Sequence, residues 1–132
     1  MISRFLTGGL FLFVMGAMVM STSQATYTNA SAPYRHVVMF QFQDDATEEQ
    51  IDDVVKAFKK LPKQIDTIRD FEYGKNVSPE GLNKGLSHCF FVTFDSKADL
   101  EAYLPHQAHQ DFVAVLKPVM KDVCVIDYIA EK

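Results

Sequence analysis

Three titratable ring side chains lie close together in the C-terminal third of this chain. Tyr103, His106 and His109 fall within seven residues. A histidine can remove a proton from a carbon next to a carbonyl group while a nearby phenol polarises the carbonyl oxygen. The segment therefore predicts an acid–base site, and His36, His88 and Asp127 are candidates to complete it.

Two other interpretations of these residues remain open. As a metal site, His106 and His109 would need His36, His88 or Asp127 as further ligands, a set that suits zinc or copper. No fixed signature such as paired CxxC or HExxH supports that site. As structural residues, the histidines would be polar caps on a small core, bonded to backbone and carboxylate groups.

Size and charge exclude several classes of function. The chain has 132 residues with 13 Lys and Arg against 17 Asp and Glu, for a net charge of −4. That is one small domain, and its acidic balance disfavours nucleic acid as a partner. It contains no glycine-rich phosphate loop, no serine nucleophile elbow and no CxxCH haem motif. We expect no cofactor.

The N-terminus is typical of a secretory signal. Arg4 precedes an apolar stretch, and small residues follow at Ser23 and Ala25. The rival, an uncleaved anchor, needs about 20 apolar residues, but the uninterrupted part has only 11 (10–20). We expect a signal peptide at 1–25 and an unstructured lead-in at 26–34. The mature protein would then be periplasmic or secreted, with no membrane contact after cleavage.

The rest of the chain alternates between strand and helix patterns. A capping box at Thr47 and Gln50 predicts a helix with an apolar face at Ile51, Val54, Val55 and Phe58. Ser96 caps a second helix with Leu100, Tyr103 and Leu104 facing inward, and a further helical stretch covers 109–116. Strands are predicted at 36–42, 71–73 (ending at Gly74), 87–94 and 123–128.

This order, β-α-β-β-α-β, is the ferredoxin-like arrangement of the α+β class. Its spatial strand order would be 4-1-3-2. We expect the first and third strands to run parallel, which puts His36 and His88 at the same end of the helix-covered face. Asp127 lies on that face at the exit of the last strand, so all three would share one rim with 103–109.

The opposite sheet face is also apolar, through Val37, Met39, Phe91 and Ile126. A chain of this size has no second layer to cover it, so we expect a homodimer with sheet packed on sheet. Cys89 and Cys124 would be two strand spacings apart, about 9.6 Å, which is too far for a disulfide. We therefore expect free thiols.

Several segments resemble the stress-responsive A/B-barrel (Dabb) family over nearly all of 35–130. The resemblance rests on the residues around His36, the run 71–78, Ser87 with His88, the run 103–109 with Phe112, and 125–128. It implies a ferredoxin-like fold that dimerises into an α+β barrel, with a pocket between helices and sheet.

The resemblance also implies roles for single residues. One plant member is a cofactor-free cyclase whose catalytic histidine and tyrosine match His109 and Tyr103. Its aspartate that orients the base matches Asp127, and its pocket-rim histidines match His36 and His88. The expected pocket wall is Val38, Phe40, Phe58, Phe90 and Phe112.

Two departures limit how far those roles transfer. Phe58 stands where the cyclase has a tyrosine, which makes the pocket more apolar, and Gln107 replaces a frequent proline. Export also separates the chain from cytosolic acyl-CoA thioesters. The sequence therefore predicts an exported protein that binds a small apolar or aromatic molecule. It is either a cofactor-independent lyase, isomerase or cyclase, or a protective, non-catalytic homo-oligomer with structural histidines.

Overall fold

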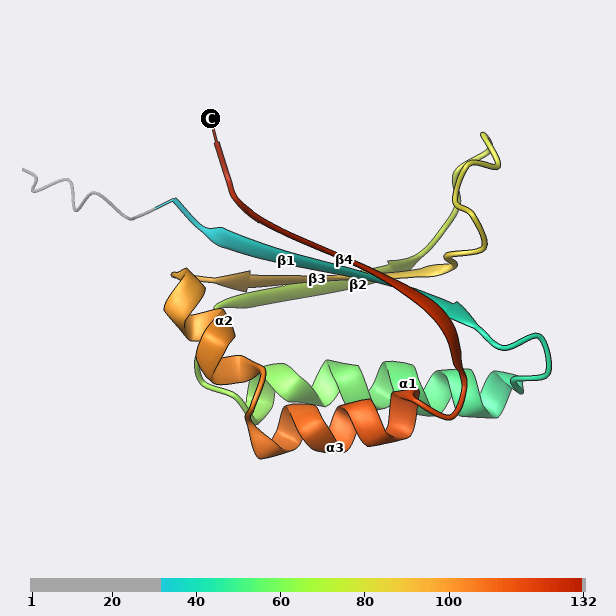
Figure 1. The fold of residues 1–132 in the computed structure, drawn as a ribbon, viewed down its shortest axis with the longest axis horizontal. Helices are drawn as coiled ribbons and strands as arrows, with labels where there is room; N and C mark the ends of the chain where they lie inside the picture. Colours follow the sequence, from blue (N-terminus) through green and yellow to red (C-terminus); the bar gives the residue numbers. More distant parts are fainter. Residues whose placement is uncertain (1–31, 132) are drawn as a thin grey trace, which may run out of the picture.

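A four-stranded antiparallel sheet with all its helices on one face forms the fold (Figure 1). The computed structural model describes residues 32–131, so the predicted signal peptide and most of the lead-in lie outside the described residues. The strand order is β2-β3-β1-β4, as predicted. The elements are β1 (Tyr34–Phe42), α1 (Glu48–Lys60), the 3-10 helix η1 (Leu61–Lys63), β2 (Asp70–Lys75), β3 (His88–Phe94), α2 (Lys97–Tyr103), α3 (Gln107–Leu116) and β4 (Met120–Ile129).

Side-chain caps fix where the three α-helices begin. The Thr47 hydroxyl accepts from the Gln50 N–H and the Gln50 side chain accepts from the Thr47 N–H, which confirms the capping box. The Ser96 hydroxyl accepts from the Asp99 N–H at the start of α2. His106 caps α3, because its Nδ1 accepts from the Ala108 N–H. This helix begins two residues before the predicted start at His109.

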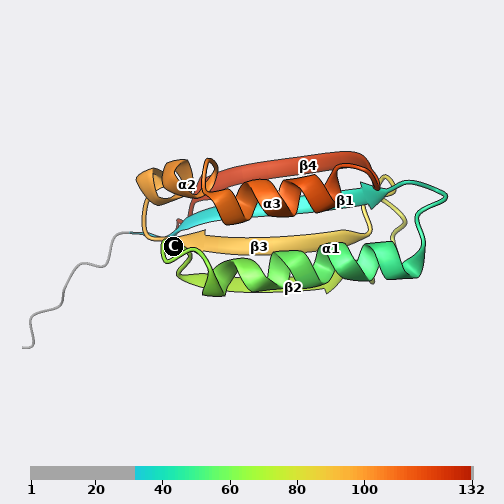
Figure 2. The same cartoon turned by 90° about the horizontal axis from the view of Figure 1, so that it is seen from below.

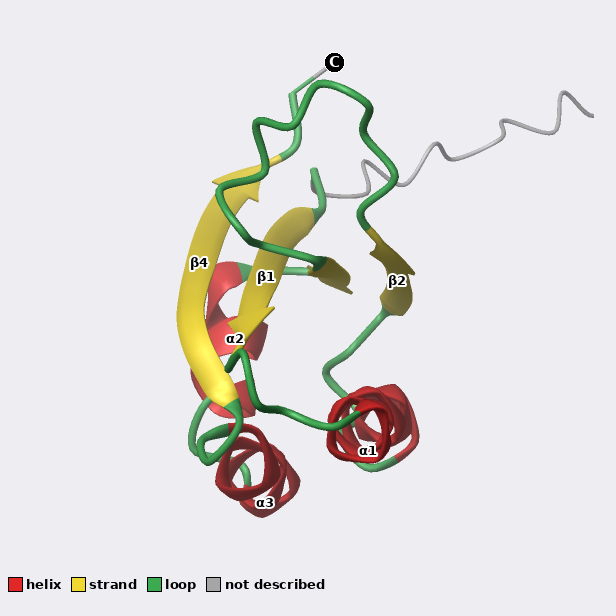
Figure 3. Cartoon of the chain, turned by 90° about the vertical axis from the view of Figure 1, so that its right-hand side faces the viewer, coloured by secondary structure: helices red, strands yellow, loops and turns green. Residues whose placement is uncertain are grey.

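Aromatic side chains fill the space between sheet and helices. Phe58 of α1 stacks on Phe112 of α3 with 4.6 Å between ring centroids, and it lies 4.3 Å from Phe90 of β3. Phe40 of β1 closes this cluster 5.3 Å from Phe90. Figure 2 shows α1 across β2 and β3 and α3 across β1, with β4 at the edge of the sheet. Figure 3 shows α1 and α3 side by side beneath the sheet.

The direction of β3 was predicted wrongly. β1 and β3 are antiparallel, with His36 opposite Val92 and His88 opposite Phe40. The α1 crossover returns the chain so that β2 runs parallel to β1, and the β2–β3 reversal then turns β3 the other way. His36 and His88 therefore lie at opposite ends of the helix-covered face, not at one end.

Two local expectations also need correction. β2 continues through Gly74, which pairs with Cys89, so the glycine does not end the strand. Leu104 is not buried in the core, because it lies just beyond the end of α2 and is 42% exposed. Pro105 follows it and the chain turns there into α3, so only Leu100 and Tyr103 of the expected stripe are buried.

No described helix covers the other sheet face, and the loop 76–87 rises beside it (Figure 1). Val37, Met39 and Phe91 are half-buried there, while Ile126 is 49% exposed. Cys89 and Cys124 both pair with Met39, one strand to each side, and both are free thiols, as predicted. Within residues 32–131, no helix has the length and apolarity to cross a membrane.

The Phe90 side chain is the best test of this packing. It is fully buried, so Phe90→Ala is expected to lower the free energy of unfolding by about 3–5 kcal/mol through a cavity in the aromatic cluster. Chemical denaturation measures the change. The control Val115→Ala removes an exposed side chain from α3 and should change the same quantity by less than about 0.5 kcal/mol. Equal losses in the two variants would contradict the packing described here.

Candidate functional site

A cavity of about 340 Å³ lies between α3, the α2–α3 turn and the inner face of β1 and β4. One end is apolar and the other carries four polar side chains. The apolar wall comes from Val38, Phe40, Phe58, Leu104, Phe112, Val113, Leu116, Met120, Val123 and Val125. The polar end is made by His36, Tyr103, His109 and Asp127. This volume suits a small organic molecule.

His36 and Asp127 form a charge-assisted hydrogen bond at the polar end. They are directly opposite each other in the β1–β4 ladder, and His36 Nδ1 lies 2.6 Å from Asp127 Oδ1. A carboxylate only accepts, so Nδ1 of His36 carries the hydrogen. The His36 side chain is 7% exposed and that of Asp127 is 33% exposed. The pair therefore fixes the tautomer of a buried imidazole that lines the cavity.

His109 is held by a different acceptor. Its Nδ1 lies 2.9 Å from the Leu104 carbonyl oxygen, which also accepts from the Gln110 side chain. Because the carbonyl accepts, Nδ1 of His109 carries the hydrogen and Nε2 keeps a lone pair in the neutral ring. Burial lowers the pKa of His109; the hydrogen bond to Leu104 opposes part of this decrease, and the nearby His36 lowers the pKa slightly further. His109 is therefore poised as a neutral base.

Tyr103 lies between the two imidazoles. Its ring centroid is 5.9 Å from that of His36 and 4.4 Å from that of His109. The side chain is almost fully buried, and burial raises the pKa of its phenol. The hydroxyl thus stays protonated at neutral pH, and no hydrogen bond joins it to another group within residues 32–131. It is available to donate to an oxygen atom in the cavity.

The structure brings together eight of the ten predicted site residues. Those that line the cavity are Tyr103, His109, Asp127, His36, Val38, Phe40, Phe58 and Phe112. Phe90 lies in the core, and His88 is at the far end of β3. Asp127 does not orient His109, the role that the resemblance implied, because it bonds to His36.

Some wall residues were missed in the sequence. Val123 and Val125 alternate with Cys124 along β4, so they share the face of Asp127. This alternation could have identified both. The Leu104 carbonyl that holds His109 is a backbone group, and no side-chain pattern reports it.

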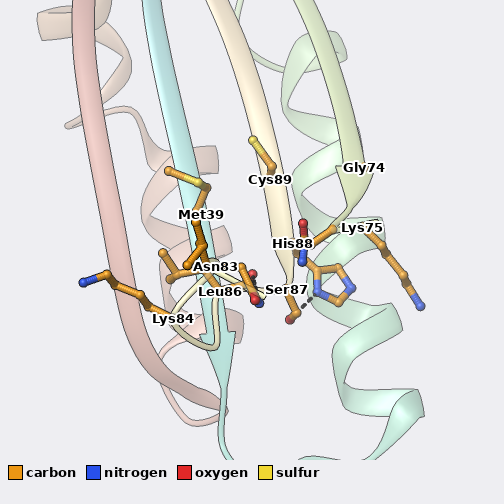
Figure 4. A pocket seen from close by; sticks show the side chains of 11 residues that line it. Met39, Gly74, Lys75, Asn83, Lys84, Leu86, Ser87, His88 and Cys89 are labelled. Carbon is orange, nitrogen blue, oxygen red and sulfur yellow. Dashed lines mark hydrogen bonds between the residues drawn. The ribbon is translucent and has the colours of Figure 1, made fainter. Parts of the chain in front are cut away.

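His88 belongs to different surroundings. Its Nδ1 lies 2.9 Å from the Ser87 hydroxyl, and its Nε2 is buried with no partner. Burial lowers the pKa of His88, and Lys75 lowers it further. His88 and Ser87 border a second hollow of about 380 Å³ between the loop 76–87 and the open sheet face, where Met39 and Cys89 lie on neighbouring strands (Figure 4).

The cluster of ligands that the metal interpretation requires is not found in the described part of the chain. No group of three or more His, Cys, Asp or Glu side chains in residues 32–131 is arranged to hold an ion. His106, one of the ligands considered, uses Nδ1 to cap α3. What the polar end does offer is a neutral imidazole base, a protonated phenol and a His–Asp pair beside an apolar wall. Such a set can remove a proton from carbon and hydrogen-bond the resulting enolate oxygen.

Two curated relatives span most of this chain. The stress-response A/B barrel domain-containing protein HS1 of Arabidopsis thaliana is 35% identical over 99 residues, which are 75% of this chain and 91% of the relative. Olivetolic acid cyclase of Cannabis sativa is 29% identical over 98 residues, 74% of this chain and 97% of the cyclase.

The chain is also similar to proteins whose structures have been solved. The crystal structure of the Arabidopsis thaliana protein At3g17210 is similar with a TM-score of 0.71 and 33% identity, covering 75% of this chain and 96% of that one. A protein of Bacteroides fragilis, described as dimeric with a ferredoxin-like fold, has a TM-score of 0.62 and 26% identity over 75% of this chain and 97% of its own. Residues 34–130 match the profile of the Stress responsive A/B Barrel Domain, and the chain belongs to this family, Dabb.

Proposed function

We propose that the protein binds a small, largely apolar carbonyl compound in the cavity and acts on it without a cofactor, with His109 as the base and Tyr103 as the hydrogen-bond donor. The reaction class is that of a lyase, isomerase or cyclase. One observation carries the proposal. The Leu104 carbonyl holds His109 in the tautomer that leaves the Nε2 lone pair free beside an apolar cavity. The relation to olivetolic acid cyclase supports it.

The second part of the proposal is a homodimer built on the open sheet face. This face carries half-buried Val37, Met39 and Phe91 together with exposed Ile126 and Tyr128, and no described helix covers it. An exposed apolar patch of this kind is typical of an interface, and a twofold contact is the commonest solution. The Bacteroides fragilis relative, which is described as dimeric, supports the same assembly.

The third part is export. The charged start, the apolar stretch and the small residues at Ser23 and Ala25 support a signal peptide that is cleaved after residue 25. Export makes a free small molecule a better substrate than an acyl-CoA thioester.

A non-catalytic protective homo-oligomer is the alternative. The observation that favours it is the His36–Asp127 bond, which ties β4 to β1 and would stabilise the fold without any ligand.

The cavity is expected to retain a ligand during purification. Native mass spectrometry of the protein from its own source should give a dimer of chains that lack the first 25 residues, with added small-molecule mass. His109→Ala and Tyr103→Phe should each reduce the occupied fraction, because each removes a polar contact worth about 1 kcal/mol, or about fivefold in affinity. The unfolding midpoint is the control. A loss of stability without a change in occupancy would favour the structural alternative.

The dimer is expected to depend on the open face. Ile126→Glu places a charge in the proposed interface and should yield a monomer at micromolar concentration in sedimentation velocity, since burying an unpaired charge is costly. The control Val115→Glu puts the same charge on the exposed side of α3 and should leave the dimer intact. A monomeric wild-type protein would refute this part of the proposal.

The histidines predict a pH dependence of stability. Burial lowers the pKa of both His88 and His109 below the ordinary histidine value of 6.5. Between that value and the lower folded pKa, the unfolded chain binds more protons than the folded protein, so the free energy of unfolding must fall as the pH decreases. Urea denaturation at several pH values below about 6.5 measures the slope. His109→Gln should make it shallower, and an unchanged slope would mean that His109 titrates as in the unfolded chain.

A further inference from the structure

The cavity contains two imidazoles, and each has its own hydrogen-bond acceptor. The Leu104 carbonyl holds His109, and Asp127 holds His36. In both cases the acceptor forms its hydrogen bond with Nδ1–H, so Nε2 is the nitrogen that can react with a ligand. A single-base site has no need of a second imidazole with its own carboxylate.

The surroundings of the two rings differ in charge. Among residues 32–131, Asp127 is the only acidic residue that lines the cavity, and it contacts His36. His109 faces the neutral Tyr103 ring and a backbone carbonyl. A positive charge on His36 therefore lies against a carboxylate, whereas a positive charge on His109 has no counter-ion of its own among the described residues that line the cavity. This asymmetry assigns His109 to taking a proton and His36 to delivering one.

We propose, on the basis of the function proposed above, that His36 with Asp127 is a second acid–base unit and that the cavity relocates a proton within an uncharged carbonyl compound. The described residues of the wall include no Lys or Arg to hold an anionic group, and the Asp127 carboxylate repels one. The substrate class is a neutral ketone or ester with an unsaturated or hydroxylated apolar part.

The step balances without any co-reactant. His109 Nε2 takes the hydrogen from the carbon next to the carbonyl, and the electron pair of that C–H bond forms the enolate, whose oxygen accepts from the Tyr103 hydroxyl. His36 enters the step as an imidazolium, with hydrogens on both Nδ1 and Nε2. Its Nε2–H bond breaks as a new C–H bond forms at a second carbon and the enolate returns to the ketone, which leaves a neutral imidazole. Solvent carries the proton from His109 back to His36. Asp127 is a positioning residue, since it acts through His36.

Two probes separate proton removal from proton relocation. 5-Nitrobenzisoxazole needs only a base, whereas the isomerisation of 3-cyclohexen-1-one to its conjugated isomer also needs a donor. The wild-type protein should accelerate both reactions. His109→Gln should lower both rates by about 100-fold, the usual contribution of a general base.

His36→Gln and Asp127→Asn test the second unit. Both variants should lower the isomerisation rate by at least about tenfold more than they change the benzisoxazole rate. The ratio of the two rates is a readout that general damage to the fold would not move. Losing both rates together would overturn the assignment of His36 as donor.

The remaining outcomes distinguish this inference from the function on which it rests. Isomerisation that His36→Gln and Asp127→Asn leave unaffected, or benzisoxazole turnover without isomerisation, would overturn the two-unit inference while the His109 base stands. A wild-type protein that accelerates neither reaction would overturn both.

Discussion

The edge strand β4 is the constraint on which the cavity depends. Within residues 32–131 it pairs only with β1, and the helices leave its inner face largely uncovered, so Val125 remains 51% exposed although it faces the helix side. A hollow between α3 and β4 follows from this incomplete cover. The His36–Asp127 bond of 2.6 Å adds a side-chain link to the β1–β4 ladder and holds the imidazole in place at the polar end. The apolar end depends on the stacking of Phe58 on Phe112.

The same strand links the cavity to the open sheet face. Successive side chains of β4 point to opposite faces, so Val125 lines the cavity while Ile126 lies on the face proposed for the dimer. An exposed edge strand with apolar residues on both of its faces is prone to aggregation unless both faces are covered. Under the proposed function, a ligand covers one face and a second copy of the chain covers the other. Binding and assembly would then both stabilise β4, which gives them a physical route to influence each other.

The sequence predicted the features that depend on local residue patterns. It did not predict the direction of β3 or the contacts that backbone register and backbone groups determine. The capping box at Thr47 and the alternation in the strands were sufficient for the elements, the strand order and the free cysteines. Strand direction follows from counting chain reversals, and the wrong count put His88 beside His36. The Asp127 partner was assigned from resemblance, but the β1–β4 register places it opposite His36.

The three buried or half-buried histidines show why residue type alone could not separate chemistry from structure. Each uses Nδ1 in a hydrogen bond, with Ser87, Leu104 or Asp127 as partner. For His88 the other nitrogen is buried with no partner. The imidazole packs at a right angle to the Phe42 ring with 5.1 Å between centroids, so Nε2 is not exposed to the hollow that His88 borders. For His36 and His109 the ring lines a cavity. A structural role requires only the hydrogen bond of Nδ1, whereas a chemical role also requires that Nε2 be open to a ligand. That difference arises from packing at β4 rather than from the histidines themselves.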